Sequence, residues 1–411
     1  MNTPFFIAKK IAKPSKKSFS SFIILIATIA VALSVTVMVI STSMVNGFTN
    51  EIAEKVYGFW GHIHINAFGS SGNPVDQYAV SLDDEVIKNI KEIDGVTSIS
   101  PIAIKPAAIL QSTGELEKTF LKGVGAEYNW YAFKKYLKQG ALPNTSDSVV
   151  SRDLLISETT ANRMNLEVGT TVNLYFIISD NPKPIARKFK VCGIYNSGLE
   201  EFDMLYTIGD IRVIQQLNKW TNKEAGSYEV IIKNTDQLDK FDALIYYNYL
   251  PGKVYSETIK SIRPNIFDWL KLQKMNGNIV LIIMLVVAIL NMVIALLILI
   301  LDRTYMIGTI KSMGGDNRFL QRVFLYWSSF IVIRGLIIGN VIGLGLCFIQ
   351  LYFGVIKLPE DAYYVTTAPI KIDWLMIALI NFGTIGCCLL FLIIPSLLIM
   401  RISPIKAIRF N

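Results

Sequence analysis

Few residues in this chain have the types and spacing needed for chemistry, and two histidines come first. His62 and His64 are its only histidines, and an i, i+2 spacing on a strand would place both on one face. Such a pair could bind a metal ion, but no cluster of cysteines or carboxylates accompanies it, so we interpret both as structural. Walker A, G-x-S-x-G, H-E-x-x-H and C-x-x-C motifs are also missing. The sequence therefore predicts no catalytic residue, no metal, no cofactor and no ATP site in this chain.

Any functional site would have to be positioned by the chain's main structural elements, and four apolar runs with little charge are the most prominent of these. They are Phe22–Met44, Ile279–Leu301, Val323–Phe353 and Trp374–Met400. Each can cross a bilayer, because a spanning helix needs roughly 20 apolar residues. The first run is longer than the roughly 7–15 residues of a signal-peptide core, so we expect a retained anchor. The sequence predicts an integral membrane protein with four transmembrane helices, one before and three after a large insert.

The formal net charge of +8 is concentrated at the two ends of the chain and in one loop. Residues 1–20 hold five lysines and no acid, the loop 302–322 holds four basic and two acidic residues, and residues 401–411 hold three basic residues and no acid. The insert 47–276 holds 25 basic and 27 acidic residues. Positive charge in short loops marks the cytoplasmic side. We therefore expect both termini and the loop 302–322 inside, the insert and the loop 354–373 outside, contact with membrane lipid, and no nucleic-acid binding.

The insert alternates short helices and strands, which predicts an α+β domain. Residues 1–46 would form an interfacial helix (3–12) and the first span, 47–276 the outer domain, and 277–411 the other spans. Helices are expected at Leu82–Ile93, Ser157–Met164, Ile208–Trp220, Leu238–Tyr247 and Thr258–Asn276. Strands are expected at Val96–Pro106, Ala108–Gln111, Lys118–Val124, Thr171–Ile178, Phe189–Tyr195 and Tyr228–Ile232. The polar segment Ser179–Ile185 would be the tip of a projecting hairpin.

Four separate stretches resemble one family. They are Ser41–Phe48 with Glu51 and Gly58–Ile63, Phe189–Leu199 with Glu201, Asp203 and Tyr206, Arg303–Gly315 with Arg322–Phe324, and Pro395 with Ile402–Arg409. The last two are similar to the cytoplasmic "R-T…I-G…K-x-M-G" loop and the "P…I-x-P-x-x-A-L-R" ending of FtsX-like permeases. The first two resemble the "MNGF…E…GF…HI" junction and the "F-x-V-x-G-I-F-x-S-G…E-x-D" segment of lipoprotein-releasing permeases of the LolC/LolE type. Arg334 departs from the pattern, because relatives usually carry an uncharged polar residue there.

The resemblance implies a non-catalytic, multi-pass subunit of a mechanotransmission-type ABC transporter in the bacterial inner membrane. Its expected partners are an ABC ATPase dimer that holds ATP and Mg, a second permease copy or a paralogue, lipoprotein substrates and a periplasmic lipoprotein chaperone. It would lift lipoproteins from the outer leaflet of the inner membrane and pass them to the chaperone. An FtsX-like signalling module that regulates cell-wall hydrolases and an efflux-type permease are the alternatives. The junction and the Phe189–Asp203 segment favour lipoprotein release.

Three groups of residues are the candidates for this work. ATPase coupling is assigned to Arg303, Ile307, Gly308, Lys311, Met313, Gly314 and Arg318, the lipoprotein cavity or gate to Met44, Asn46, Gly47, Phe48 and Asn291, and chaperone docking to Asp180, Asn181, Pro182 and Pro184. Each group has a plainer interpretation, namely a connecting loop that only sets topology, a helix that ends at a glycine cap, and a solvated hairpin turn. Gly335, Gly339 and Gly343 form a small-residue face that we expect to pack against the fourth span or within its own bundle.

Overall fold

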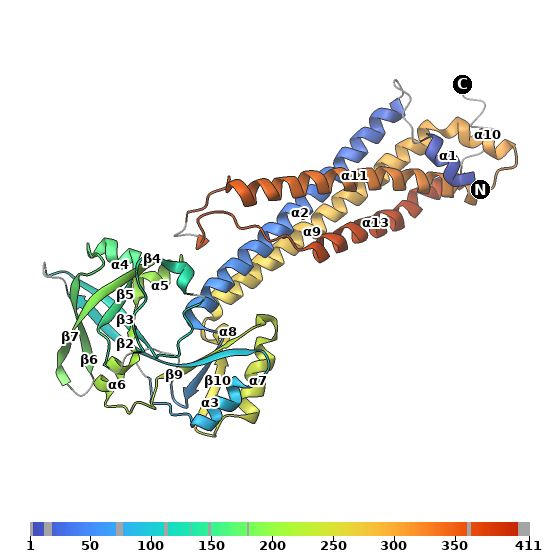
Figure 1. Ribbon diagram of the computed structural model, residues 1–411. Helices are drawn as coiled ribbons and strands as arrows, with labels where there is room; N and C mark the ends of the chain where they lie inside the picture. Colours follow the sequence, from blue (N-terminus) through green and yellow to red (C-terminus); the bar gives the residue numbers. More distant parts are fainter. Residues whose placement is uncertain are drawn as a thin grey trace. The chain divides into compact units, whose positions relative to one another are not determined.

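The computed structural model describes residues 3–11, 19–70, 77–110, 114–131, 133–146, 149–178, 181–359 and 363–401. Within these residues the chain forms two compact units (Figure 1). The helical unit takes its residues from Met1–Asn50, Trp269–Lys357 and Thr367–Asn411, and the inserted unit takes its residues from Glu51–Asp268 and Leu358–Thr366. We describe each unit by itself.

Four helices in the described part of the chain are long and apolar enough to cross a membrane. These candidate spans are Ser21–Trp60, Pro264–Asp302, Asn317–Phe353 and Trp374–Met400. They lie in α2 (Phe19–Trp60), α9 (Pro264–Asp302), α11 (Asn317–Phe353) and α13 (Trp374–Ser396) with α14 (Leu398–Arg401). Each predicted apolar run falls inside one of them, so the predicted architecture of one span before and three after the insert is confirmed.

Helix α2 is much longer than its apolar run. Its 42 residues extend about 63 Å, roughly twice the thickness of a bilayer's hydrocarbon core. The interpretation of Gly47 as a glycine cap that ends the first helix is therefore wrong. The helix continues because Ile52, Val56 and Phe59 keep apolar side chains at helical spacing, and all three are fully buried.

Glycines bring α11 against α2 inside the helical unit. A Cβ on Gly335 would lie 2.8 Å from Val31 Cβ, and a Cβ on Gly339 would lie 2.6 Å from the Ala32 carbonyl oxygen. The Thr36 hydroxyl donates to the Gly339 carbonyl at 3.1 Å. The predicted small-residue face therefore packs on the first span, with backbones close enough to exclude any side chain between them.

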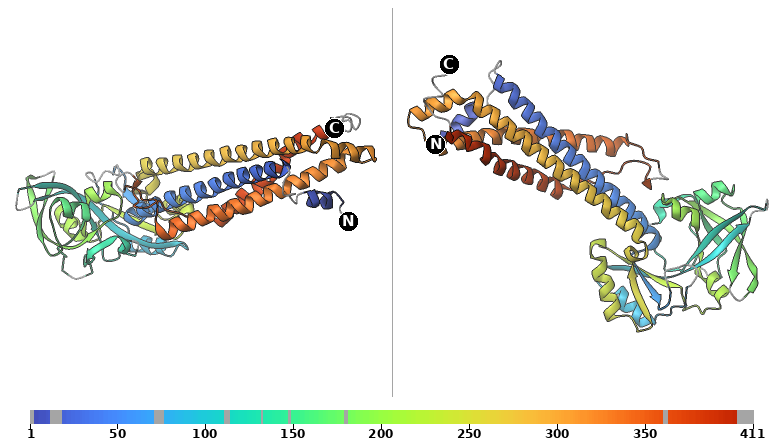
Figure 2. Two further views of the ribbon diagram at one scale, coloured as in Figure 1. Left: turned by 90° about the horizontal axis from the view of Figure 1, so that it is seen from above. Right: turned by 180° about the vertical axis from the view of Figure 1, so that it is seen from behind.

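Two further helices complete the helical unit. The short helix α1 (Thr3–Ile11) lies beside α11, where the ring of Phe5 packs against those of Tyr326 and Phe330 at centroid distances of 5.7 and 5.6 Å. Helix α10 (Thr304–Ser312) follows α9 directly. Figure 2 shows α1 and α10 at the same end of the helical unit.

The inserted unit is built on one large sheet. Its strands are β1 (Ile63–Ala67), β2 (Val96–Leu110), β3 (Leu116–Val124), β4 (Leu137–Gly140), β5 (Asp153–Ser157), β6 (Thr171–Ile178), β7 (Asn181–Tyr195), β8 (Tyr206–Asp210), β9 (Ser227–Ile232) and β10 (Val254–Thr258). Their order is β10-β1-β9-β2-β3-β8-β5-β7-β4, with β6 paired to β2 and β7. The long strand β2 joins the two halves of the sheet, since its first part pairs with β9 and its second part with β6.

Short helices accompany this sheet and complete the predicted α+β class. They are α3 (Asp84–Lys91), α4 (Glu158–Arg163), α5 (Glu200–Leu205), α6 (Ile211–Asn218), α7 (Leu238–Asn248) and α8 (Ile259–Ile262), with single 3-10 turns at Lys134–Tyr136 and Thr235–Gln237. Three predictions need correction. The helix expected over Thr258–Asn276 is interrupted at Arg263, between α8 and α9. The two strands expected between Val96 and Gln111 are one strand, and Ile208–Asp210 is strand instead of helix, because β8 pairs in parallel with the central strand β3.

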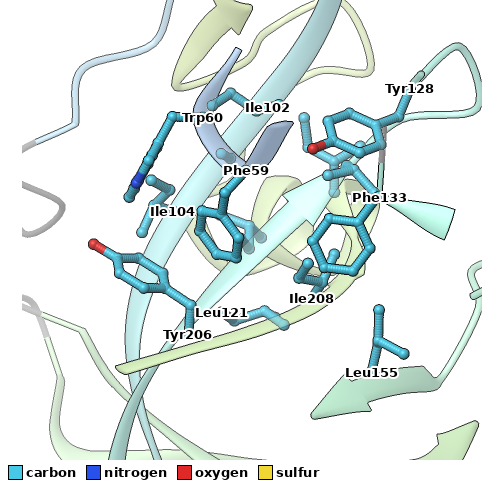
Figure 3. Packing of buried hydrophobic residues seen from close by; sticks show 14 of the residues in the cluster. Phe59, Trp60, Ile102, Ile104, Leu121, Tyr128, Phe133, Leu155, Tyr206 and Ile208 are labelled. Carbon is cyan, nitrogen blue, oxygen red and sulfur yellow. The ribbon is translucent and has the colours of Figure 1, made fainter. Parts of the chain in front are cut away.

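The core of the inserted unit forms around the last turn of α2. Phe59 is fully buried, and its ring stacks on Phe202 and packs edge-on against Tyr206. Figure 3 shows Phe59 surrounded by Trp60, Tyr206 and Phe133, with Leu121 and Ile208 from the sheet beneath. The end of the helix is thus part of the core of this unit, and aromatic packing of this kind contributes beyond its buried area.

Candidate functional site

The predicted coupling loop folds as helix α10 with a glycine-terminated end. The Gly314 amide donates to the Lys311 carbonyl at 3.1 Å, and the Gly315 amide donates to the Ile310 carbonyl at 2.9 Å. Gly314 has a φ of +87°, a left-handed conformation that favours glycine. This bonding pattern is a Schellman cap, so the two glycines stop α10 sharply before α11 begins.

The structure separates the predicted coupling residues into exposed and buried sets. Met313 is 82% exposed at the end of α10, and Gly314 and Arg318 are exposed beside it. Ile307 and Gly308 are buried on the opposite side, and Ile307 belongs to the apolar core of the helical unit. A partner protein could therefore reach Met313, Gly314 and Arg318, while Ile307 and Gly308 anchor α10 to the bundle.

Lys311 and Arg303 make specific contacts within the helical unit. The ammonium of Lys311 donates to the Ile399 carbonyl at 2.6 Å, at the end of the last helix, where carbonyls lack intrahelical partners. Arg303, between α9 and α10, pairs with Asp302 at 3.4 Å. The Lys311 contact links α10 to α14, whereas the Arg303 pair joins neighbouring residues at the junction of α9 and α10.

Four of the predicted gate residues, between Met44 and Phe48, lie inside the continuous helix α2. A Cβ on Gly47 would approach the Pro369 carbonyl oxygen to 2.3 Å, and the Lys371 amide donates to the Ser43 carbonyl at 3.0 Å. Phe48 packs edge-on against Trp269 of α9 at a centroid distance of 5.5 Å. Met44 and Asn46 are half-buried nearby on α2. Gly47 therefore serves a close backbone approach by the segment before α13.

Helix α9 exposes a long apolar stripe. Its exposed members are Ile279, Ile282, Ile283, Val286, Val287, Leu290, Ile294, Ile298 and Leu301. Asn291 is half-buried and lies four residues after Val287 and three before Ile294, at the margin of this stripe. The structure thus places Asn291 beside an apolar surface that faces away from the rest of the chain.

The predicted hairpin is present, and most of the segment expected to form its tip belongs to strand β7. Strands β6 and β7 pair antiparallel, and Ile178 lies opposite Asn181. Asn181, Pro182 and Pro184 are therefore strand residues, and Pro184 is exposed. Asp180 lies outside the described residues.

The two histidines bond to backbone at the end of α2. The Ile232 amide donates to His62 Nδ1 at 2.8 Å, and His64 Nε2 donates to the Trp60 carbonyl at 2.7 Å. Burial lowers the pKa of His62 to about 4, and burial together with the charge of Lys122 lowers the pKa of His64 to about 3. Among the described residues no group of three or more histidine, cysteine or acidic side chains could hold a metal ion.

Two polar pairs escaped the sequence analysis. Lys122 and Glu229 form an ion pair of 2.7 Å in the core of the inserted unit. Asn340 of α11 and Asn381 of α13 exchange amide hydrogen bonds of 2.6 and 3.1 Å. The asparagine pair could have been predicted from the sequence, because an amide inside an apolar span needs a hydrogen-bonding partner. The ion pair could not have been predicted, since Lys122 and Glu229 are far apart in the chain.

The fold and these elements define an integral membrane protein whose large domain is inserted after its first span. The family model of the MacB-like periplasmic core domain matches residues 24–245, and that of the FtsX-like permease C-terminal region matches residues 278–404. The chain belongs to this family of permeases and is of the LolC/LolE type. It is an inner-membrane protein with a large periplasmic domain. It is a non-catalytic subunit, and the ATPase of such systems resides in a separate subunit.

Several relatives match nearly the whole chain. The lipoprotein-releasing system transmembrane protein LolE of Haemophilus influenzae is 20% identical over 99% of this chain and 99% of its own. The LolC protein of Xylella fastidiosa is 22% identical over 96% of each chain, and that of Neisseria meningitidis is 20% identical over 96% of each. The structure is also similar to the periplasmic region of MacB from Actinobacillus actinomycetemcomitans (17% identity, TM-score 0.35, covering 50% of this chain and 92% of that chain).

Proposed function

We propose that the protein is the permease subunit of an ATP-driven transporter that extracts lipoproteins from the outer leaflet of the inner membrane and passes them to a periplasmic chaperone. A separate ATPase dimer supplies the energy, and a second permease copy or a paralogue completes the membrane part. Energy input is needed because each acyl CH₂ withdrawn from the bilayer costs about 0.8 kcal/mol.

The observation that carries this proposal is the continuity of α2 and α9. Both helices are about 60 Å long, and both pass from the helical unit into the inserted unit without a loop. Helix α10 is capped by the exposed Met313 and begins at Thr304, with only Arg303 between it and the end of α9. A displacement of α10 by an ATPase would therefore act directly on α9, and through it on the periplasmic domain.

The exposed apolar stripe of α9 supports a lipid-handling role. Two copies of such a stripe, one from each permease, would line an apolar space for acyl chains, with Asn291 at its edge. Met44, Asn46 and Phe48 would border the same space on α2. The β6–β7 hairpin is the proposed contact for the chaperone, with Pro184 exposed near its tip.

The test replaces Met313 by aspartate in the full-length protein. Met313→Asp places a charge where α10 would contact the ATPase, without the strain that Gly314→Asp would add at a positive φ. We expect ATPase co-purification and lipoprotein release from spheroplasts to fall about tenfold or more, which corresponds to about 1.4 kcal/mol. Tyr131→Asp is the matched control, because Tyr131 is 86% exposed in the inserted unit.

Mass spectrometry of the purified wild-type complex tests the function itself. Recovery of an ABC ATPase together with triacylated lipoproteins supports lipoprotein release. Recovery of the ATPase with a peptidoglycan hydrolase and no lipoprotein would instead favour the signalling alternative. Unchanged release in Met313→Asp would refute the coupling role of α10 alone.

A further inference from the structure

Arg334 is a charged residue in the middle of an apolar membrane helix. It lies within the candidate span Asn317–Phe353, and its neighbours Ile333, Ile337 and Ile338 are 45%, 60% and 44% exposed. Arg334 is exposed as well, and it forms no hydrogen bond or ion pair with any residue that the structure describes. A charge exposed to hydrocarbon is unfavourable, so we look for a polar group beyond the described residues that can meet it.

The position of Arg334 is set by the contact between α11 and α1. Val323, Trp327, Phe330 and Arg334 follow one another at helical spacing along one face of α11. Val323 and Trp327 are buried, and Phe330 packs against Phe5 of α1 at 5.6 Å. Arg334 lies one turn, about 6 Å, farther along, and is the first uncovered position of this face beyond α1.

The depth of Arg334 follows from the asparagine pair. Asn340 and Asn381 lie at the same level, because they bond each other. Trp374, which begins α13 and is 63% exposed, marks the outer interface, since tryptophan prefers that zone. Arg334 is then about 20 Å from the outer boundary and about 10 Å from the inner one, given about 30 Å of hydrocarbon. A long arginine side chain can extend toward the nearer interface.

Helix α1 brings further positive charge to the same end of the bundle. Its sequence contains Lys9 and Lys10 and no acid, and both lysines are exposed. Phe6 is 52% exposed on the same short helix. Exposed apolar and basic groups on one helix are typical of an interfacial helix beside anionic lipid.

We propose that Arg334 and α1 form a binding site for the phosphate of an anionic phospholipid in the cytoplasmic leaflet. The guanidinium can bind two phosphate oxygens at once, while Lys9 and Lys10 favour a net negative headgroup. This site is separate from the transported lipoprotein, which enters from the other leaflet in the proposed function.

The experiment measures thermal unfolding of the full-length protein in nanodiscs of phosphatidylcholine alone or mixed with phosphatidylglycerol. We expect phosphatidylglycerol to raise the unfolding midpoint of the wild type, and Arg334→Gln to reduce that rise by about 2 °C or more. Arg334→Lys should keep part of the rise, because it keeps the positive charge but cannot bind two phosphate oxygens at once as the guanidinium does. Lys357→Gln, at an exposed position beyond the other end of α11, is the control and should keep the full rise.

Native mass spectrometry supplies a second measurement. The wild type should retain more phosphatidylglycerol than Arg334→Gln, and inorganic phosphate added to phosphatidylcholine discs should not reproduce the rise. An equal lipid response in both proteins would overturn the proposal. So would a rise produced by inorganic phosphate, which would indicate a soluble ligand. Loss of the second permease from the Arg334→Gln complex with an unchanged lipid response would assign Arg334 to a protein interface instead.

Discussion

Lys122 and Glu229 form an ion pair of 2.7 Å although their side chains are only 0% and 1% exposed. The same ammonium donates to the Phe59 carbonyl at 2.6 Å and lies 5.3 Å from the ring centroid of Trp60. Phe59 is in the last turn of α2, where carbonyls lack helical partners. Burial lowers the pKa of Lys122 and raises that of Glu229, while each charge opposes the shift of the other. The pair therefore fastens the end of α2 to strands β3 and β9.

Removing one member of this pair should destabilise the inserted unit strongly. Lys122→Met leaves the Glu229 carboxylate buried without a counter-charge, and we expect a loss of about 3–5 kcal/mol in the free energy of unfolding. Denaturant unfolding of the detergent-solubilised protein, followed by tryptophan fluorescence, measures this loss.

The double variant Lys122→Met/Glu229→Leu separates charge burial from packing. We expect it to recover most of the lost stability, because an apolar pair of similar volume leaves no charge unpaired. A double variant as unstable as Lys122→Met would show that the hydrogen bond to Phe59 matters more than the pairing.

Stability should fall as the pH drops below the ordinary range of histidine. His62 and His64 stay neutral in the fold, with pKa values of about 4 and about 3, but become protonated near pH 6.5 when unfolded. The unfolded state therefore binds more protons between about pH 6.5 and 4, and stability is lost across that window. The shifts from 6.5 to about 4 for His62 and to about 3 for His64 correspond to losses on the order of 3 and 5 kcal/mol once each group is protonated in the fold.

Unfolding measured at about pH 7.5 and about pH 5.5 tests this dependence. His62→Asn can still accept from the Ile232 amide, and His64→Gln can still donate to the Trp60 carbonyl. We expect the double variant to show a smaller difference between the two pH values than the wild type. An undiminished difference would assign the acid sensitivity to other groups.

A larger residue at Gly339 should separate α11 from α2. In Gly339→Leu the new side chain would meet the Ala32 carbonyl oxygen and Val35 Cβ, which lie 2.6 and 2.8 Å from the Cβ position. We expect a loss of about 1–3 kcal/mol, seen as a lower thermal midpoint in detergent. Gly345→Leu is the matched control on the same helix, since a Cβ there meets nothing within 4 Å. Equal losses in both variants would mean that the loss comes from replacing a glycine in α11 and not from the contact with α2.

Asn340 and Asn381 should be coupled in stability. Replacing either by leucine removes two amide bonds across α11 and α13 and leaves the other amide short of partners, at a cost of about 1 kcal/mol. The double leucine variant should lose less than the sum of the two single variants. Strict additivity in this double-mutant cycle would mean that the two amides do not support each other.

The sequence predicted the parts of this fold that local composition determines. The four spans, the α+β insert and the β6–β7 hairpin follow from apolar runs and alternation over neighbouring residues. The end of α2 was misplaced because Gly47 was interpreted as a helix stop. In the fold, Gly47 instead meets the carbonyl of Pro369, a contact that no local pattern contains. Ile52, Val56 and Phe59 were the available signal that the helix continues.

The candidate site was predictable to a smaller extent. The glycines that end α10 follow from local chemistry, because Gly314 needs a positive φ. The contact of Lys311 with the Ile399 carbonyl and the pairing of Lys122 with Glu229 depend on which elements meet in three dimensions. Arg334 was visible in the sequence as a charge in an apolar run. Only the structure shows that it lies on the exposed face of α11.

Because α2 is unbroken, a change in the number of its residues also rotates one part of the helix relative to the other. Each residue advances the helix by about 1.5 Å and turns it by about 100°. One residue added between Asn46 and Glu51 would thus turn the rest of α2, up to Trp60, by about 100° relative to the part before it, whereas seven added residues would nearly restore the phase. Substitutions at exposed positions of this segment keep its helical phase, whereas insertions and deletions keep it only in steps close to whole turns.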